Sequence, residues 1–533
     1  MDIGAGFDYK IFDWLTFVSN NKVGLSNSYG ENYYDPKAVG QESLQGTIYN
    51  SNSNVRTIYT SQLLRFLKTF NDVHEINAYL GYDYDEYRYY SMTGQASQMF
   101  QGNEILNGGV ANPKVGGTKV EKKNAAYYFN GNYSYDNKYL FQVMFRVDGS
   151  SQFGSNKRWA PFWSVGGGWS MHKEEFMSNL KWVNELKPRI SYGISGNLPG
   201  GAYEWATMLA STTQYGGKVG LYSNYLGNPD LSWEETATLD FGLDVRLFDR
   251  LSIVFDYYHK NVKNLIYLKH LPAVTGYNRQ TANNGKMTNQ GFEVTVTPEI
   301  IRTKDLYWDV SFNLGYNKNE ITELYNGVQE YVMATTGMKL AVGHSYGEFY
   351  LNRYAGVNPA TGDPLWYDKN GEVTPVMNES DKVLVGHSYI APWQGGFGTV
   401  VSWKGLSLGA QFSWVADRWM INNDRYFEEN TTFDNYNLSR RMLYDRWKQA
   451  GDVTSIPRYG VTPQFDTHLL ENASFLRLKN LSLGYTLPAS LLERTKVLSS
   501  ARVYVQAQNL FTFTDFSGMD PESVQMCIRR NIL

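Results

Sequence analysis

The chain has 533 residues, a net charge of −3 and a single cysteine, Cys527. The low net charge and the lack of a dense basic run exclude an electrostatic case for nucleic-acid binding, and one cysteine excludes a disulfide framework. Apolar runs are far shorter than the roughly 18 residues that a membrane-spanning helix needs, which excludes a helical membrane protein. Aromatic residues make up 15% of the chain, with 41 Tyr and 14 Trp, and both types suit a membrane–water boundary.

Segments of about 10 residues alternate apolar and polar side chains, which is the period of a β-strand with two unlike faces. In one of them, Trp308 and Phe312 fall on one face and Asp309 and Asn313 on the other. Arg and Asp on such polar faces are costly in lipid but suit a water-filled lumen. In chain order the clearest predicted strands are 127–136, 139–148, 237–246, 251–258, 308–317, 406–415 and 502–508.

The predicted connections are of two kinds. Short turns are expected at 12–13, 136–138, 248–250 and 404–405, and long polar loops at 91–123, 198–232, 260–287, 320–345 and 417–470. Short turns at one end and long loops at the other are typical of outer-membrane barrels, whose long loops face outside the cell. With about 16 to 18 strand candidates, the pattern predicts an all-β fold, a transmembrane antiparallel up-and-down β-barrel.

Two groups of acidic residues are candidates for catalytic or metal sites. Glu234 and Glu235 are adjacent, and adjacent strand residues face opposite sides, so they cannot act as an acid/base pair on one substrate. Asp363 and Asp368 lie in a stretch that partly resembles a calcium loop but lacks EF-hand spacing, and a Gly-rich turn is the favoured interpretation. The seven His show no zinc-ligand spacing.

A glycine run and several aromatic residues are further candidates for binding sites. Gly166–Gly168 precede no Gly-Lys-Ser/Thr, so a glycine-rich strand is favoured over a phosphate loop. Aromatic residues in supposed loops can stack on sugar rings, but the favoured interpretation is an interfacial aromatic girdle or loop packing. These residues are Tyr82, Tyr84, Tyr87, Tyr89, Tyr90, Trp366, Trp393, Trp414 and Trp419. We therefore expect no enzyme, with no catalytic, cofactor or metal residues, and the substrate-binding residues stay unassigned.

A set of longer sequence blocks carries a family resemblance. Together they resemble the SusC/RagA family, the starch-utilisation type of TonB-dependent outer-membrane transporter of Bacteroidetes. The ordered set is specific and covers nearly the whole chain. The blocks are 152–164, 168–170, 175–176, 186–197, 228–236, 256–260, 284–293, 356–364, 471–485 and 509–512.

The resemblance implies an architecture and a mode of transport. It implies a 22-stranded barrel around an N-terminal plug and a SusD-like surface lipoprotein on the extracellular loops. Oligosaccharide or peptide cargo would be imported across the outer membrane, with energy delivered by the TonB complex through a TonB box ahead of the plug. No cofactor and no covalent chemistry are implied.

Both ends depart from the family pattern. The plug, the TonB box and a signal peptide are not seen ahead of Met1, so residues 1–525 are expected to form a partial barrel that does not perform energised transport by itself. Residues 526–533 lack strand alternation and are expected to be an aberrant tail.

Two alternatives from other classes stay open at this point. A passive porin or surface adhesin barrel would show the same strand pattern without a plug. A secreted all-β glycan-binding or glycan-cleaving protein would explain the Tyr content and would purify without detergent. The sequence does not name the cargo.

Overall fold

The computed structural model describes residues 1–333, 338–433, 437–493 and 496–522. Within these ranges sixteen strands form one antiparallel sheet, in the order β1 to β8, β11, β12, β15, β16, β24, β25, β28 and β29. In the same ranges, no helix is both long enough and apolar enough to cross a bilayer. The described part of the chain is therefore a strand-dominated structure, as the alternation predicts.

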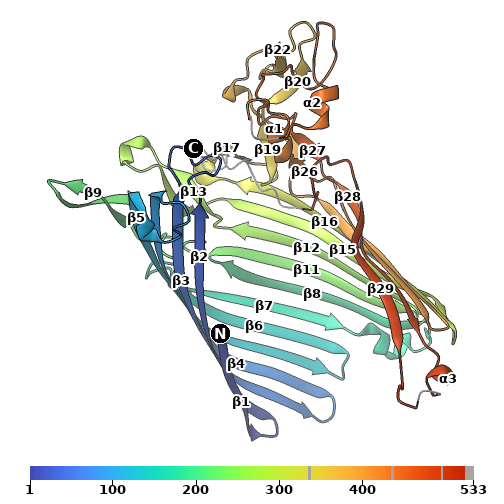
Figure 1. Cartoon of the computed structure of the whole chain (residues 1–533). Coiled ribbons are helices and arrows are strands. Elements are labelled where there is room, and N and C mark those ends of the chain that lie inside the picture. Colours follow the sequence, from blue (N-terminus) through green and yellow to red (C-terminus); the bar gives the residue numbers. More distant parts are fainter. Residues whose placement is uncertain (334–337, 434–436, 494–495, 523–533) are drawn as a thin grey trace. The chain divides into compact units, whose positions relative to one another are not determined.

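The chain divides into two compact units, and the first comprises residues 1–169, 191–237 and 264–283. Figure 1 shows its long strands side by side in chain order. They are β1 (Asp2–Phe12), β2 (Leu15–Tyr34), β3 (Thr47–Phe70), β4 (His74–Met99), β5 (Gly109–Tyr135), β6 (Tyr139–Ser150) and β7 (Trp159–Trp169). Its loops carry η1 (Leu106–Gly108), hairpin β9 (Met208–Tyr215)–β10 (Lys218–Tyr225), and hairpin β13 (Ile266–His270)–β14 (Arg279–Asn283) with η4 (Ala273–Thr275).

The second unit comprises residues 170–190, 238–263 and 284–533. Strands β8 (Val183–Asn197) and β11 (Glu234–Leu247) have residues in both units. The other long strands of the second unit are β12 (Leu251–Lys263), β15 (Lys286–Arg302), β16 (Leu306–Glu323), β24 (Trp393–Trp403), β25 (Leu406–Ala416), β28 (Phe475–Thr486) and β29 (Arg502–Thr514). Short 3₁₀ turns η2 (Met171–Lys173) and η3 (Glu175–Met177) precede β8, and α3 (Ala489–Leu492) precedes β29.

Many short elements of the second unit lie in its two longest connections. Between β16 and β24 are η5 (Tyr325–Gly327), β17 (Glu330–Val332), β18 (Lys339–Ala341), β19 (Glu348–Leu351), β20 (Arg353–Val357), β21 (Pro364–Tyr367), β22 (Val373–Thr374), η6 (Glu379–Asp381) and β23 (Val383–Ser388). Between β25 and β28 are β26 (Trp419–Ile421), α1 (Asn423–Glu428), α2 (Arg440–Tyr444) and β27 (Leu470–Asn472). We call the described residues of 348–388 and 417–472 the loop head; Figure 1 shows it beyond the ends of the strands of its unit.

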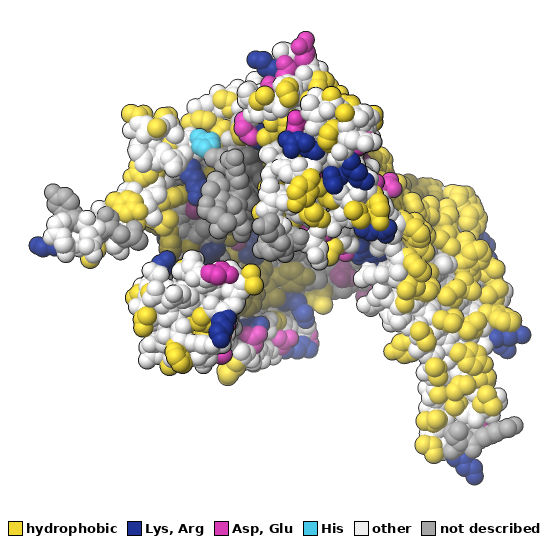
Figure 2. Space-filling view, turned by 45° about the horizontal axis from the view of Figure 1, so that its top comes forward, with side chains coloured by type: hydrophobic (Ala, Val, Ile, Leu, Met, Phe, Trp, Pro, Cys, Tyr) yellow, Lys and Arg dark blue, Asp and Glu magenta, His cyan; other side chains and the backbone are white. Residues whose placement is uncertain are grey.

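The strands expose their apolar faces, which is the reverse of a soluble protein. On β6, Tyr139, Phe141 and Phe145 are each nearly half exposed, whereas Arg146 and Asp148 of the opposite face are engaged in an ion pair. Figure 2 shows hydrophobic side chains gathered over the strands around β29 in the second unit. A row of exposed aromatic and aliphatic side chains along paired strands is stable in lipid and not in water.

The short turns have the backbone of tight hairpins. Residue pairs 71–72, 136–137, 248–249 and 404–405 all have positive φ at both positions. Two consecutive positive φ values are the signature of a type I′ turn, whose twist matches that of the flanking strands. Three of the four predicted turns are confirmed, and the fourth is shifted by one residue, because β1 runs to Phe12 and the turn occupies residues 13–14.

One predicted loop is wrong. Residues 91–99 and 109–123 belong to β4 and β5, and the connection is only 100–108. The two strands have 26 and 27 residues, far more than the 9–11 that cross a bilayer, so they continue as a ribbon past the apolar band. Polar and glycine residues interrupt the hydrophobic alternation of that ribbon, although Ala96 and Met99 join a buried apolar cluster with Ile48. The cross-strand pairing still continues to Met99 and Gly109.

The other long loops are confirmed in outline with strand ends shifted by a few residues. The connection after β16 is longer than predicted, since all of 324–392 separates β16 from β24. One barrel domain over 1–525 stays a prediction, and the tail 526–533 lies outside the described residues.

Candidate functional site

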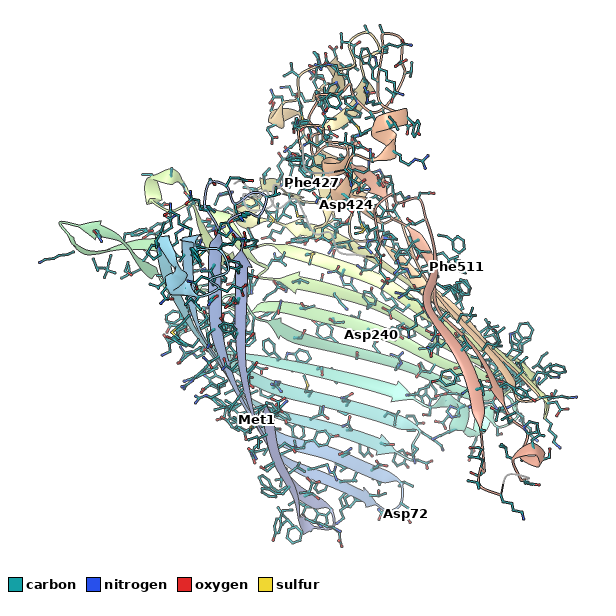
Figure 3. The ribbon with its side chains drawn as sticks, viewed as in Figure 1. Met1, Asp72, Asp240, Asp424, Phe427 and Phe511 are labelled. Carbon is teal, nitrogen blue, oxygen red and sulfur yellow. The ribbon has the colours of Figure 1, made fainter. Side chains whose placement is uncertain are left out.

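In the second unit, Arg189 is the centre of a charged group on the polar face of β8, β11 and β12. Its guanidinium nitrogens lie 2.6 Å from Asp256, 3.3 Å from Asp244 and 3.6 Å from Asp240. Figure 3 labels Asp240 on its strand. Gly242 makes room for this group, because a Cβ there would lie 2.2 Å from the guanidinium carbon. The face is therefore built to hold charges in water.

The outward face of the same strands is apolar. Leu239, Phe241 and Tyr257 alternate with the aspartates and are exposed by 41–43%. Charge on one face and aromatic side chains on the other are what a strand needs between a wet interior and lipid.

The first unit has a matching polar face. Arg146 on β6 lies 2.8 Å from Asp148 and 3.4 Å from Asp83, and its guanidinium lies over the ring of Tyr128. This group borders a groove of about 400 Å³ that Trp233 also lines. In each unit, the polar strand face thus carries charged side chains that are held in place by partners of the same unit.

A second groove of the first unit is lined by tyrosines. Tyr87, Tyr89, Tyr203 and Tyr225 surround a space of about 500 Å³ together with Lys122. The Tyr203 hydroxyl accepts the Glu121 backbone N–H at 3.0 Å, and Lys122 donates to the Gly200 carbonyl at 3.0 Å, so the loop after β8 is held against β5. We call this the tyrosine groove; aromatic rings beside a cation suit sugar rings and peptide side chains alike.

The loop head of the second unit has a buried ionic core around Glu429. Its carboxylate lies 2.9 Å from Arg425, 2.9 Å from Arg441 and 3.0 Å from Nε2 of His468, and its side chain is 2% exposed. Burial by itself raises the pKa of Glu429, but hydrogen bonds from His468 and Arg425 outweigh it and lower that pKa to about 2. Arg425 also donates to Glu471 at 2.7 Å, which joins α1 to β27.

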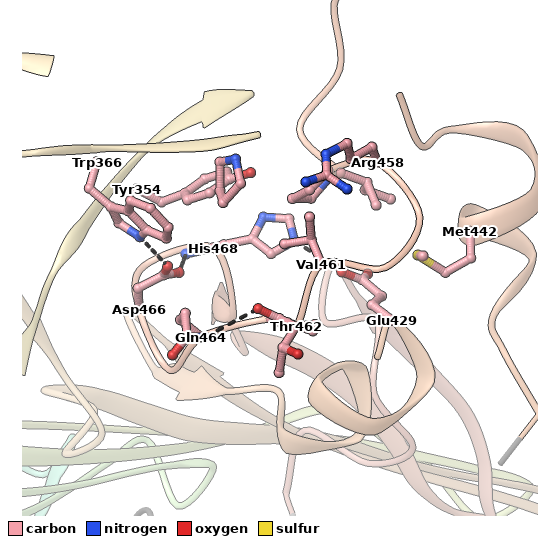
Figure 4. Close-up of a pocket in the computed structure, with 14 residues that line it drawn as sticks. Tyr354, Trp366, Glu429, Met442, Arg458, Val461, Thr462, Gln464, Asp466 and His468 are labelled. Carbon is pink, nitrogen blue, oxygen red and sulfur yellow. Dashed lines mark hydrogen bonds and ion pairs between the residues drawn. The ribbon is translucent and has the colours of Figure 1, made fainter. Parts of the chain in front are cut away.

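A small cavity lies beside this core (Figure 4). Tyr354, Trp366, Asp466 and His468 line it, and its volume of about 20 Å³ holds about one water molecule. The Trp366 indole N–H donates to Asp466 at 2.7 Å, and burial raises the pKa of Asp466. The cavity is therefore too small to hold a nutrient molecule.

The acidic residues singled out in the sequence have structural roles. Glu234 accepts the Ile266 backbone N–H at 3.0 Å and anchors hairpin β13–β14, with Glu235 next to it on β11. Asp368 accepts the N–H groups of Asn370 and Glu372 in a turn, and Asp363 pairs with Arg458 at 2.9 Å. The turn prediction is confirmed for residues 368–371, but it is wrong for Pro364–Tyr367, which form strand β21. Within the described ranges, no three His, Cys, Asp or Glu gather as metal ligands.

The glycines and several aromatic residues occupy strands. Gly166–Gly168 pair with β6 inside β7, which confirms a glycine-rich strand. The prediction that the five tyrosines from Tyr82 to Tyr90 lie in a loop is wrong, because all five lie on β4.

Their side chains then divide by strand parity. Tyr82 packs on Tyr127 with ring centroids 4.9 Å apart, whereas Tyr87 and Tyr89 line the tyrosine groove. Tyr84 donates to Glu86, and Tyr90 is exposed.

Most of the four tryptophans singled out in the sequence pack against other side chains. Trp393 on β24 contacts Tyr316 at 4.4 Å between ring centroids, and Trp419 stacks on His387 at 3.7 Å. Trp414 lies on β25 opposite Gly395, and Trp366 is buried in the loop head. The predicted packing role is confirmed for Trp366, Trp393 and Trp419.

The groups around Arg189 and Glu429 were not singled out from the sequence. Arg425 on α1 and Glu429 at its C-terminal cap stand four residues apart, a common helical pair that by itself has no functional meaning. The aspartates around Arg189 followed from the general expectation of a wet strand face, but their meeting depends on strand register.

Comparison with known proteins decides the family. Residues 2–510 match the family described as TonB dependent receptor-like, beta-barrel. The chain belongs to this family. Its relatives and structural neighbours place it among the SusC/RagA type of TonB-dependent receptors.

Several relatives are informative. TonB-dependent receptor P39 of Formosa agariphila is 26% identical over 97% of this chain and 56% of its own length. TonB-dependent receptor SusC of Bacteroides thetaiotaomicron is 29% identical over 74% of this chain and 41% of its own length. The chain therefore spans about half the length of the curated relatives it matches.

Among solved structures, the RagAB peptide transporter matches with a TM-score of 0.85 and 32% identity, over 98% of this chain and 59% of that chain. The copper transporter OprC is only 11% identical with a TM-score of 0.51, so it shares the fold alone.

Proposed function

We propose that this chain supplies barrel strands and cell-surface loops of an outer-membrane transporter that imports peptides or oligosaccharides. The likeness to the RagAB peptide transporter carries the proposal, with 32% identity along nearly the whole chain. The two unlike strand faces support it, because Arg189 and its aspartates need a wet interior while Phe241 and Tyr257 need lipid.

The tyrosine groove is the proposed contact for cargo in the first unit. It lies on the same strand face as Asp83 and Asp85, the wet face of β4, and it is open enough to admit a chain of sugars or amino acids. Tyrosine rings offer flat apolar surface at low entropic cost, and Lys122 adds a positive charge for acidic groups.

A SusD-like lipoprotein on the long loops and the TonB complex are the proposed partners. The four longest connections, 198–233, 264–285, 324–392 and 417–474, all leave the strands opposite the tight turns. A loop head with its own ionic core provides a firm platform for a partner protein.

The test is uptake by host cells. Deletion of the gene should abolish uptake of one cargo class, measured with labelled peptides and labelled oligosaccharides side by side. Restoring the gene should restore uptake, and loss of the TonB complex should abolish it again. Uptake that continues without TonB would favour the passive-porin alternative instead.

The tyrosine groove makes a sharper prediction. Tyr87→Ala together with Tyr203→Ala should raise the KM for uptake about 30-fold, since each ring contact is worth on the order of 1 kcal/mol and two are lost. Tyr29→Ala is the matched control, because Tyr29 is exposed on the opposite face of β2. An unchanged KM in the double variant would remove the tyrosine groove from the cargo path.

A further inference from the structure

One face of β3, β4 and β5 in the first unit carries three successive bands. At the tight-turn end the register pairs His74 with Tyr135, and His74 and Tyr133 are hydrogen-bonded at 2.7 Å. Leu80 and Phe129 form the apolar middle and are exposed by 61% and 41%. A second aromatic border ends the apolar middle at the other side; there Tyr82 pairs with Tyr127 and Tyr84 with Ala125.

The height of this band matches the hydrocarbon layer of an outer membrane. The stretch from His74 to Tyr84 rises about 33 Å along the strand and about 25 Å along the membrane normal at the tilt of barrel strands. Tyr84 therefore marks the edge of the apolar layer on the long-loop side. Whatever follows Tyr84 on this face lies at the level of lipid headgroups.

Charged residues follow immediately. Glu86 is the centre, with Arg88 at 2.5 Å, Arg56 at 2.9 Å and Lys123 at 3.9 Å from its carboxylate. Its side chain is 7% exposed, whereas the side chains of the three cations are 41–44% exposed. The carboxylate thus fixes the cations in place, while the cation side chains stay partly exposed.

The next row extends the group and leaves an excess of positive charge. Lys119 pairs across the strands with Tyr90, its side chain is 73% exposed, and it lies 3.7 Å from Glu121. We call Arg56, Arg88, Lys119 and Lys123 with Glu86 and Glu121 the outward cationic patch; its formal charge is positive, because four cations face two carboxylates. Arg56, Arg88 and Lys119 also line a groove of about 600 Å³.

We propose that the outward cationic patch binds the phosphorylated headgroup of an anionic lipid in the outer leaflet. Guanidinium and ammonium donors match phosphate oxygens, and the acyl chains of such a lipid would lie along Leu80 and Phe129 below. A patch that served only to solvate the ribbon would need no excess of cations. The inference takes from the proposed function only that the strands span the outer membrane.

The test titrates lipid A, a phosphorylated outer-leaflet lipid, into the receptor purified from its host in detergent, with binding followed by native mass spectrometry. The Arg88→Gln/Lys119→Gln variant should bind lipid A about 30-fold more weakly than the unmodified receptor, because each basic group near an anionic surface adds to the attraction. The Arg65→Gln/Lys114→Gln variant is the matched control, since both residues lie on the opposite strand face. It should bind within about twofold of the unmodified receptor.

Two outcomes would overturn the proposal. One is equal binding of lipid A by the two double variants; the other is equally tight binding of the deacylated, phosphorylated disaccharide, which would assign the patch to a soluble phosphate compound. Uptake and gel mobility of the same variants are measured as well, so that a failure of the lipid site can be distinguished from a failure of the proposed transport function. A receptor that folds and transports normally but binds no lipid A contradicts only the lipid site.

Discussion

At the scale of single residues, the tight turns put unusual demands on side chains. Lys404 has φ of +46° and Gly405 has φ of +91°, the conformation that glycine and asparagine adopt with least strain. Gly405 is needed for a second reason, because a Cβ there would lie 2.6 Å from the Thr486 carbonyl oxygen.

These two neighbours give opposite predictions. Lys404→Asn should stabilise the protein by up to about 1 kcal/mol, because asparagine tolerates positive φ. Gly405→Ala should destabilise it by about 1–3 kcal/mol through strain and contact with Thr486. The temperature at which the folded band disappears from an unboiled gel measures both, and shifts of the same sign would contradict the turn assignment.

Glu429 is the residue on which the loop head most depends. Glu429→Gln should destabilise the loop head by about 3 kcal/mol, because Arg425 and His468 would lose a buried anionic partner. Glu379→Gln is the control, since the Glu379 side chain is 68% exposed and its ion pair with Lys382 is worth little. Proteolysis of the loop head should accelerate in the first variant and stay unchanged in the second.

The same carboxylate predicts a pH dependence. The pKa of Glu429 is lowered from 4.5 to about 2, so its contribution to stability is present above about pH 4.5 and is lost as the pH falls toward 2. Asp466 affects the pH dependence of stability in the opposite direction, because burial raises its pKa. Both variants retain Asp466, so its effect cancels when they are compared. Pepsin digestion should therefore show an acid loss of protection in Glu379→Gln that is reduced in Glu429→Gln.

At the scale of the strand, the two faces set what a substitution costs. Phe129 lies in the middle of the apolar band of β5, between Leu80 and Phe145, and its neighbour Asn130 lies on the wet face. Phe129→Lys should destabilise the protein by about 2–4 kcal/mol, whereas Asn130→Lys should change its stability by less than about 1 kcal/mol. Urea unfolding in lipid vesicles measures both, and equal effects would contradict the assignment of faces.

Strand length is the element-scale feature that sequence reasoning missed. The alternation identified β5 from Tyr127 onward, where one face meets the hydrocarbon of the membrane, but not from Gly109, where β5 has passed beyond that layer. Hydrophobic alternation reports the solvent on each side of a strand and not the hydrogen bonds that make it a strand.

At the scale of the whole molecule, the family and the strand faces predict a heat-stable barrel. The receptor as its host makes it should migrate faster on a gel unheated than boiled, because a folded barrel is compact and binds less detergent. Equal mobility would count against a closed barrel.

The sequence by itself determined the strand periods, the apolar and wet faces, the tight turns and the family. The strand periods, the faces and the turns are local properties, since the side-chain period of two and the turn residues need no distant partner. Only the tertiary structure decided that Arg189 meets Asp256, that Glu429 meets His468, and that Arg56, Glu86 and Lys123 share one face. Such meetings depend on the register between strands and loops far apart in the chain, and a shift of one residue would send every one of those strand side chains to the other face.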